Sequence, residues 1–321
     1  MTSVDHGTDH RADHGADHGA DPPVRNHVVS AGLVLAGAAL FGTVGTAQAI
    51  GPVVPVGQLA CVRLVLAGLL LCAVAAATRQ LRAIGPMFRC SPTWWAVLGQ
   101  AGFNLCFLGA MFEAGVAVGT LIAIGATPIL TGLATRQVSR NWLVATGIAV
   151  TGLVLLVGGQ ASGDGPPVSV AGIALALGAS ASYATYIIAG NAAASRGLET
   201  APFLGAAFAG AGLLTLPLLL LGEVTWVGTA GGALLVGYLA LVPTVLAYHL
   251  FNRGLRGVRP STASTLGLIE PVVAAGLAFV LLGERLAVVG TLGAALILVG
   301  LLLIVRTVEQ DRDPAPGELV R

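Results

Sequence analysis

A succession of long apolar runs constrains this chain more than any other feature of its sequence. Between residues 28 and 305, apolar stretches follow one another with only short polar or Gly/Pro-rich breaks between them. Only 10% of the residues are charged, against about 25% in a typical soluble domain. Each run approaches the roughly 20 residues that a helix needs to cross a bilayer, and a helix satisfies its own backbone hydrogen bonds in lipid. The sequence therefore predicts an all-α membrane protein.

The placement of arginine supports a count of ten transmembrane helices. All 16 basic residues are arginine. With the N-terminus in the cytoplasm, ten crossings place every arginine except Arg63 and Arg285 in cytoplasmic segments, which is the positive-inside pattern. We therefore expect a multi-pass protein of the cell inner (cytoplasmic) membrane with both termini cytoplasmic. The runs are 29–49, 56–78, 93–112, 116–135, 141–158, 168–190, 202–222, 229–251, 261–282 and 287–305.

An internal duplication is visible in three pairs of short segments that share a near-constant offset. A tandem repeat of five helices predicts such an offset, and because five is odd, the second copy must enter the membrane upside down. The sequence thus predicts two inverted five-helix repeats, 29–158 and 168–305. In transporters of this architecture the substrate site lies near the midplane between the halves. The pairs are Phe41-Gly42 with Tyr183-Ala184, residues 67–70 with 211–214, and Thr127-Pro128 with Glu270-Pro271.

The second half carries a resemblance to a known family. Residues 263–275 (ASTLGLIEPVVAA), followed by 281–286 (LLGERL) and a glycine-spaced last helix, resemble the second repeat of an EamA-type carrier of the drug/metabolite transporter superfamily. Residues 248–255 resemble the end of that family's eighth helix, and Arg63 resembles an arginine often found in its second helix. The first repeat departs from the family pattern at residues 136–140. The resemblance implies ten helices built from two inverted units, and export of small metabolites.

Glu270 is the strongest candidate for a substrate or coupling site. It lies inside an apolar run, where an ionisable group is costly and usually faces a cavity or a partner. Pro271 has no backbone N–H and is expected to leave the carbonyl of Gly267 without its helical partner. An acid beside a free carbonyl would form a polar binding or proton-coupling point. The alternative is a structural carboxyl that pairs with an arginine or a tyrosine.

Thr127-Pro128 is the counterpart of Glu270-Pro271 in the first repeat, and Arg63 is the other charge within a run. Thr127 offers a hydroxyl to a substrate path, but a proline kink also serves simply to bend a helix around its neighbours. Arg63 has three open roles. The first role is binding of a substrate carboxylate, the second is an ion pair with Glu270 or Glu113, and the third is extension of the side chain to the lipid headgroups.

Two pairs of polar residues have spacings that place each pair on one helix face. Gln100 and Asn104 are four apart, and Tyr183 and Tyr186 are three apart. Each pair either lines a cavity and binds a ligand or forms hydrogen bonds between helices, which contribute only about 0.6 kcal/mol each on average in a membrane. Asn252 lies near a helix end and is expected at the membrane interface.

The tails differ in composition from the body of the chain. Within residues 1–28, the segment 5–20 repeats Asp-His every four residues and holds no large apolar side chain, so we expect a disordered cytoplasmic tail. Imidazole and carboxylate groups suit Zn²⁺, Ni²⁺ or Cu²⁺, which makes a weak divalent-metal site the alternative to a tail without function. Residues 306–321 are expected to form a short cytoplasmic tail. The tail histidines are His6, His10, His14 and His18.

These features predict a secondary transporter and not an enzyme. Beyond residue 28 the chain holds a single histidine, His249, so a Ser/His hydrolase or a zinc-protease site has almost nothing to use. No phosphate-binding loop, cofactor motif or nucleic-acid surface is evident. We expect export of a small organic metabolite, with proton coupling through Glu270 as a hypothesis. The alternative is a non-transporting membrane protein that uses its His-rich tail as a metal sensor.

Overall fold

The computed structural model describes residues 27–159, 169–219 and 221–310, with side chains described as far as Arg306. Within these ranges the protein is helical throughout and contains no strand. The predicted tail histidines (His6, His10, His14 and His18) and most of the C-terminal tail lie outside the described residues. Nine segments of the described chain are long and apolar enough to span a membrane. They are His27–Ile50, Val56–Ala77, Ser91–Thr135, Arg140–Gly158, Val170–Ser195, Thr200–Leu219, Ala230–Gly254, Pro260–Leu282 and Val288–Arg306.

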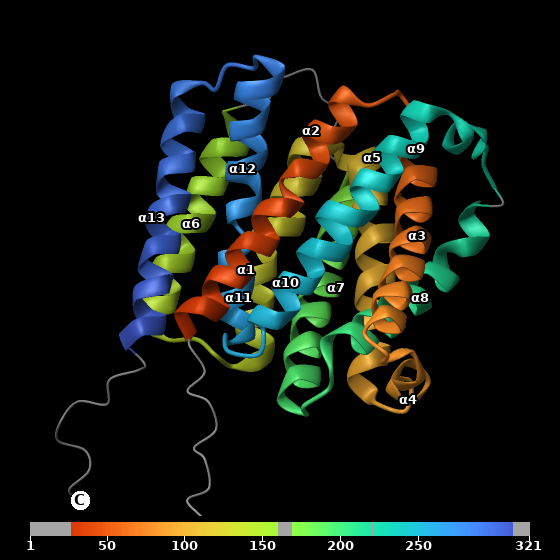
Figure 1. Cartoon of the computed structure of the whole chain (residues 1–321). Coiled ribbons are helices and arrows are strands. Elements are labelled where there is room, and N and C mark those ends of the chain that lie inside the picture. The colour runs from red at the N-terminus through yellow and green to blue at the C-terminus, as the bar shows by residue number, and fades with distance from the viewer. Residues whose placement is uncertain (1–26, 160–168, 220, 311–321) are drawn as a thin grey trace, which may run out of the picture.

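The helices form one elongated bundle (Figure 1). In chain order its main elements are α1 (His27–Phe41), α2 (Thr43–Ile50), α3 (Val56–Ala77), α5 (Ser91–Thr135), α6 (Arg140–Gly158), α7 (Val170–Ser195), α8 (Thr200–Leu219), α9 (Ala230–Ala240), η3 (Leu241–Leu246), α10 (Ala247–Gly254), α11 (Pro260–Leu266), α12 (Ile269–Leu277), η4 (Ala278–Leu282) and α13 (Val288–Gln310). The short η1 (Leu81–Ala83), α4 (Ile84–Met87) and η2 (Thr225–Gly228) lie in connections.

One element accounts for the difference between nine segments and the ten runs that the sequence predicts. The runs 93–112 and 116–135 both fall within α5, whose 45 residues include a non-helical backbone at Gly115 (φ 79°, ψ 162°). This positive φ is accessible to glycine because it has no Cβ, and it joins two helices across a kink. At 1.5 Å per residue the 45 residues of α5 make about 68 Å of helix, more than twice the roughly 30 Å of a bilayer core. The chain folds back at this kink, since a Cβ on Gly119 would lie 3.3 Å from the carbonyl oxygen of Ala110.

Other spans contain breaks that hydropathy alone does not reveal. The first span divides at Gly42, and the span of Pro260–Leu282 divides between α11 and α12. The span of Ala230–Gly254 contains η3, a π-helical segment that includes Pro243. Proline lacks the N–H that would continue the helical ladder, and π-helical turns are frequent at functional sites. Most of these breaks face the interior cavity described below.

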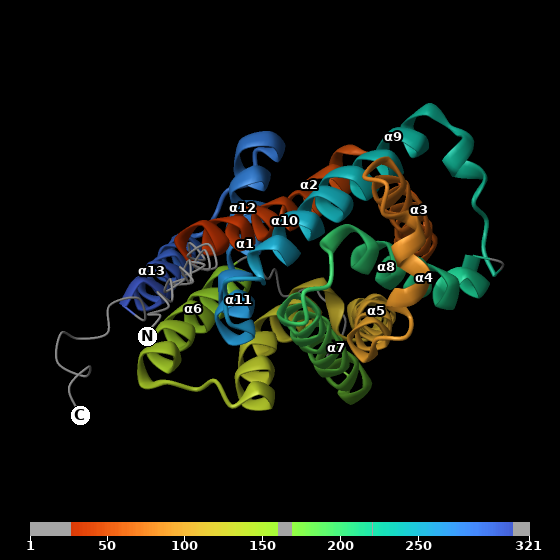
Figure 2. The same cartoon turned by 60° about the horizontal axis from the view of Figure 1, so that its bottom comes forward.

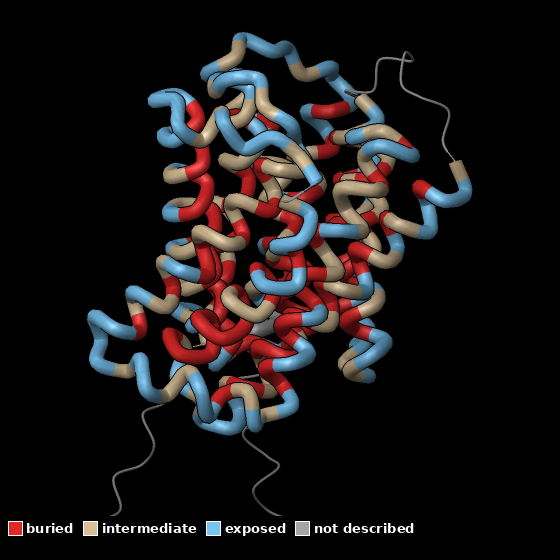
Figure 3. The backbone as a smooth tube through the Cα atoms, turned by 90° about the vertical axis from the view of Figure 1, so that its right-hand side faces the viewer, coloured by how far each residue is buried: buried red, intermediate tan, exposed pale blue. Residues whose placement is uncertain are grey.

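The bundle is held together by pairs of helices, one from each half of the chain. The extensively packed pairs are α5 with α7, α6 with α13, α3 with α8, and α1 with α10, as Figure 2 shows from another side. Small residues permit this closeness: a Cβ on Gly152 of α6 would lie 2.6 Å from the carbonyl oxygen of Gly293 of α13. Buried residues run through the centre of the bundle, and exposed ones cover its outside (Figure 3). Exposed side chains such as Leu69, Leu213 and Leu302 present an apolar surface to lipid.

The start of α1 and the end of α13 lie at the same end of the bundle (Figure 1). We call this the terminal end, and the opposite end, where α2 finishes and α3 begins, the far end. These two ends serve as the reference for the site.

Candidate functional site: a cavity between the two halves

A cavity of about 690 Å³ extends from the middle of the bundle towards the far end. Its wall comes from both halves of the chain and includes α2, α3, α5, α6 and α7 together with η3, α10, α12 and η4. Gln48, Val116 and Glu284 line it near the far end. A volume in this range is typical of sites for small organic molecules, and the wall is mostly apolar with a few convergent polar groups.

One side of the cavity is a hydrogen-bonded polar wall. Arg63 of α3 donates from Nη2 to Oδ1 of Asn104 on α5 at 3.3 Å. Asn104 is anchored in turn, since its Nδ2 donates to the carbonyl oxygen of Gln100 at 2.9 Å. Gln100 donates from Nε2 to the hydroxyl of Tyr248 on α10 at 3.2 Å. All four side chains line the cavity, and the other N–H groups of the guanidinium remain for a ligand or water.

Glu270 lines the same cavity from α12, in the other half of the chain. It is near enough to Arg63 for the two charges to attract each other. The backbone of α12 at Glu270 packs closely against Gly42, since a Cβ on Gly42 would lie 2.6 Å from the carbonyl oxygen of Glu270. One expectation is wrong: the carbonyl of Gly267 is not free, because the backbone N–H of Glu270 donates to it at 3.1 Å. The chain makes a tight turn between α11 and α12, which supplies the donor that Pro271 lacks.

The remaining candidates divide between the cavity and the packed core. Tyr183 and Pro271 line the cavity, whereas Thr127, with its neighbour Pro128, and Tyr186 are buried away from its wall. The hydroxyl of Thr127 donates to the carbonyl of Ala123 at 2.7 Å and lies 3.1 Å from the hydroxyl of Ser180 on α7. Of the two X-Pro pairs that the predicted repeat aligns, therefore, only the one in the second half faces the cavity.

Two residues of α10 were not recognised as site residues by the sequence analysis. Asn252, expected at the membrane interface, is buried among the helices with 4% exposed, and its Nδ2 donates to the hydroxyl of Tyr186 at 2.6 Å. Tyr248 forms the floor of the cavity, with its ring centroid 4.8 Å from that of Phe41 and 4.7 Å from that of Phe208. Tyr248 and Asn252 are four residues apart, the spacing that singled out Gln100 and Asn104, so the same test would have found them.

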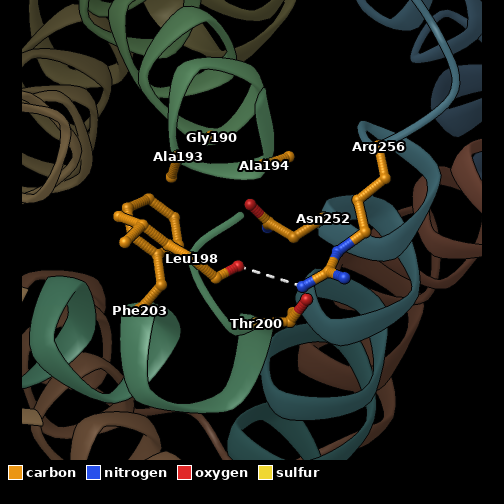
Figure 4. Close-up of a pocket in the computed structure, with 8 residues that line it drawn as sticks. All are labelled: Gly190, Ala193, Ala194, Leu198, Thr200, Phe203, Asn252 and Arg256. Atoms are coloured by element: carbon orange, nitrogen blue, oxygen red, sulfur yellow. Dashed lines mark hydrogen bonds between the residues drawn. The ribbon is translucent and has the colours of Figure 1, made fainter. Parts of the chain in front are cut away.

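A second pocket lies near the terminal end and is much smaller. Its volume of about 10 Å³ has room for about one water molecule. Asn252 and Arg256 line it on one side, and Arg256 donates from Nη2 to the carbonyl oxygen of Leu198 at 3.0 Å (Figure 4). Among the described residues no group of three or more His, Cys, Asp or Glu side chains is arranged to hold a metal ion.

Apolar spans that enclose a metabolite-sized cavity with opposite charges from two halves define a multi-pass membrane transporter. The comparisons with known proteins agree. The chain is 33% identical over 281 residues to the uncharacterized transporter YwfM of Bacillus subtilis, covering 84% of this chain and 92% of that one. Residues 170–306 match the EamA-like transporter family. The chain belongs to the EamA-like transporter family.

Two further similarities are partial or structural. An uncharacterized transporter of Archaeoglobus fulgidus is 36% identical over 76 residues, which is 24% of this chain and 28% of that one. A solved crystal structure of a protein superposes with a TM-score of 0.74 at 19% identity, covering 88% of this chain and 99% of its own. At that identity the likeness shows a shared fold alone.

Proposed function

We propose that this protein is a secondary transporter that exports a small organic metabolite across the cytoplasmic membrane by alternating access. The observation that carries the proposal is the meeting of Arg63 and Glu270, from opposite halves of the chain, at one cavity inside an otherwise apolar bundle. Charged groups within a membrane are costly, and they mark substrate or ion pathways. A site between two halves becomes accessible from alternate sides when one half rocks against the other.

The proposed topology has ten crossings, arranged as two inverted repeats over residues 29–158 and 168–305. The length of α5 and its kink at Gly115 support two crossings within that element. The pairing of helices from the two halves and the shared end of α1 and α13 agree with an inverted arrangement. The distribution of arginine favours a cytoplasmic terminal end, so we place the far end, towards which the cavity extends, on the outside.

Glu270 is the proposed coupling group. In its ionised form the carboxylate binds a cationic or hydrogen-donating group of the substrate, while Arg63, held by Asn104, limits how far the carboxylate moves. A proton that enters from the far end neutralises the carboxylate and releases the substrate to the outside. Proton and substrate thus compete for one group, which converts a proton gradient into export.

The alternatives have less support. No chemistry in the described residues calls for an enzymatic step, and the family to which the chain belongs is one of transporters. The metal-sensor alternative depends on His6, His10, His14 and His18, which lie outside the described residues. Deleting residues 1–27 separates the two functions, because a transporter keeps its flux and a sensor loses its response to metal.

The test is a flux screen with purified full-length protein in proteoliposomes, with and without a pH gradient. For a substrate that responds to the gradient, Glu270→Gln is expected to abolish the gradient-driven part of the flux, because the amide cannot exchange a proton. Glu199→Gln, an exposed acid outside the cavity, is the matched control and should leave the flux unchanged. Gradient-driven flux that persists in Glu270→Gln would contradict the coupling role.

A further inference from the structure

A thin polar layer separates the cavity from the small pocket at the terminal end. Tyr248 forms the cavity floor, and the ring of Tyr186 on α7 packs against it, with the centroids 5.3 Å apart. Asn252, one turn further along α10, donates to the hydroxyl of Tyr186 and also lines the small pocket. Its side chain points from α10 towards α7 in Figure 4. Three side chains therefore lie between the two spaces.

Polar atoms that accept no hydrogen bond from the protein lie at both faces of this layer, one of them on the neighbouring Gln100. Oε1 of Gln100, on the cavity side, and Oδ1 of Asn252, on the pocket side, are buried and have no hydrogen-bond partner. Buried polar atoms normally find partners, and leaving them unpaired is especially unfavourable where no water is available. Gln100 lines the cavity and Asn252 lines the small pocket, both of which have room for water, so this layer offers acceptors to water or to a polar solute.

The helix that carries this layer has a hinge. Immediately before α10, the π-helical η3 contains Pro243 and Thr244, both of which line the cavity. Thr244 donates its hydroxyl to the carbonyl oxygen of Leu239 at 2.7 Å, where an α-helical backbone bond is interrupted. Helix kinks concentrate at prolines and π-turns, so α10 is able to tilt relative to α9 without unfolding.

The seam between α7 and α10 is closed largely by side-chain hydrogen bonds. Besides the bond from Asn252 to Tyr186, Asn191 of α7 donates to the carbonyl oxygen of Leu255 at 2.8 Å. Arg256 donates to the carbonyl oxygen of Leu198, just after α7. At this seam Gly190 permits close approach, since a Cβ there would lie 2.8 Å from Oδ1 of Asn252. Such bonds exchange readily for bonds to water or to a solute.

We propose that the substrate path to the terminal end runs between α7 and α10, and that the layer of Tyr248, Tyr186 and Asn252 is the gate that closes it in this structure. This inference rests on the proposed function, since a gate has meaning only in a transporter. When α10 tilts about η3, the Asn252–Tyr186 bond breaks, the small pocket joins the cavity, and the unpaired oxygens of Gln100 and Asn252 face the path.

Thiol labelling tests the path without knowledge of the substrate. The full-length protein, with its four native cysteines replaced by alanine, is reconstituted and treated from either side with a membrane-impermeant sulfonate maleimide. Ala274→Cys reports on the cavity, and Ala193→Cys reports on the seam, because Ala193 is 2% exposed and lines the small pocket. Ala145→Cys is the control, fully buried between α6 and α13 near the terminal end.

The expected result is labelling of Ala274→Cys from both sides, labelling of Ala193→Cys from the terminal side, and no labelling of Ala145→Cys. If Ala274→Cys reacts from both sides while Ala193→Cys stays unreactive, the proposed alternating access is supported and the proposed path between α7 and α10 is refuted. If Ala274→Cys reacts only from the far side under all conditions, the alternating access of the proposed function fails as well.

A gate variant distinguishes opening from simple exposure of the seam. Tyr186→Phe keeps the ring but removes the hydroxyl that accepts the bond from Asn252. It should raise the labelling rate of Ala193→Cys roughly threefold. An average hydrogen bond between membrane helices contributes about 0.6 kcal/mol, and its loss increases the population of the open state by about that factor. Tyr238→Phe, at an exposed tyrosine of α9, should not change the rate. Equal rates in the two variants would refute the gate.

Discussion

Replacing Gly42 by alanine is expected to disturb the site that holds Glu270, although it adds only one methyl group. A Cβ at this position would lie 2.6 Å from the carbonyl oxygen of Glu270, 2.9 Å from Cβ of Val273 and 3.1 Å from the backbone nitrogen of Ala274. All three atoms belong to the backbone of α12 or are attached directly to it, so no flexible side chain can move aside. The helix itself must shift, and overpacking of this kind costs about 1–3 kcal/mol.

Gly32→Ala is the matched control, because a Cβ there meets nothing within 4 Å. In a helix interior, alanine is favoured over glycine by about 0.5–1 kcal/mol, so this variant should be as stable as the parent or slightly more stable. The two chemically identical changes should therefore differ by about 1.5–4 kcal/mol, the sum of the overpacking cost and the helix preference. Unfolding in mixed micelles with a rising fraction of denaturing detergent, followed by tryptophan fluorescence, measures the difference.

Measuring flux separates an effect of Gly42→Ala on the Glu270 site from a general loss of stability. Because Gly42 contacts the turn of α12 that carries Glu270, folded Gly42→Ala protein should transport more slowly than Gly32→Ala protein at equal amounts in the membrane. Equal stability and equal flux of the two variants would show that α12 does not depend on this contact, and the reasoning from close approach would be refuted.

Three further predictions concern the charges and the topology. Glu270→Asp should retain part of the pH dependence of the flux, because it keeps the acid but shortens its reach; flux as strong and as pH-dependent as in the parent would argue against a fixed position for this carboxyl. Arg63→Lys keeps the charge but loses the planar donor geometry. The KM for the substrate should therefore rise roughly tenfold, which corresponds to about 1.4 kcal/mol of binding free energy. Arg285→Lys, the control, should leave the KM unchanged. Reporter fusions should show alternating sides, and a single reversed site would contradict the inverted repeat. Fusions after residues 51, 163 and 223 should report the outside, and those after 82, 196 and 259 the cytoplasm.

Two positions show what spacing along the chain leaves undecided. Thr127-Pro128 and Glu270-Pro271 look equivalent in the sequence, yet Thr127 bonds to its own helix and packs against Ser180, while Glu270 faces the cavity. Asn252 lies near a helix end in sequence but is buried between helices in space. In both cases spacing along the chain gives the face of a helix, and the rotation of that helix against its neighbours decides what the face meets.

What the sequence by itself determined is the class of the protein and the position of its spans. The free energy of transferring a run of side chains into lipid is a sum over neighbouring residues and does not depend on what the helix packs against. The tertiary structure alone decided that Arg63 and Glu270 share one cavity, that Gly115 kinks a single 45-residue element, and that Tyr248 forms a floor. Such juxtapositions depend on close contacts between segments far apart in the chain, where a missing Cβ such as that of Gly42 sets how near two helices come.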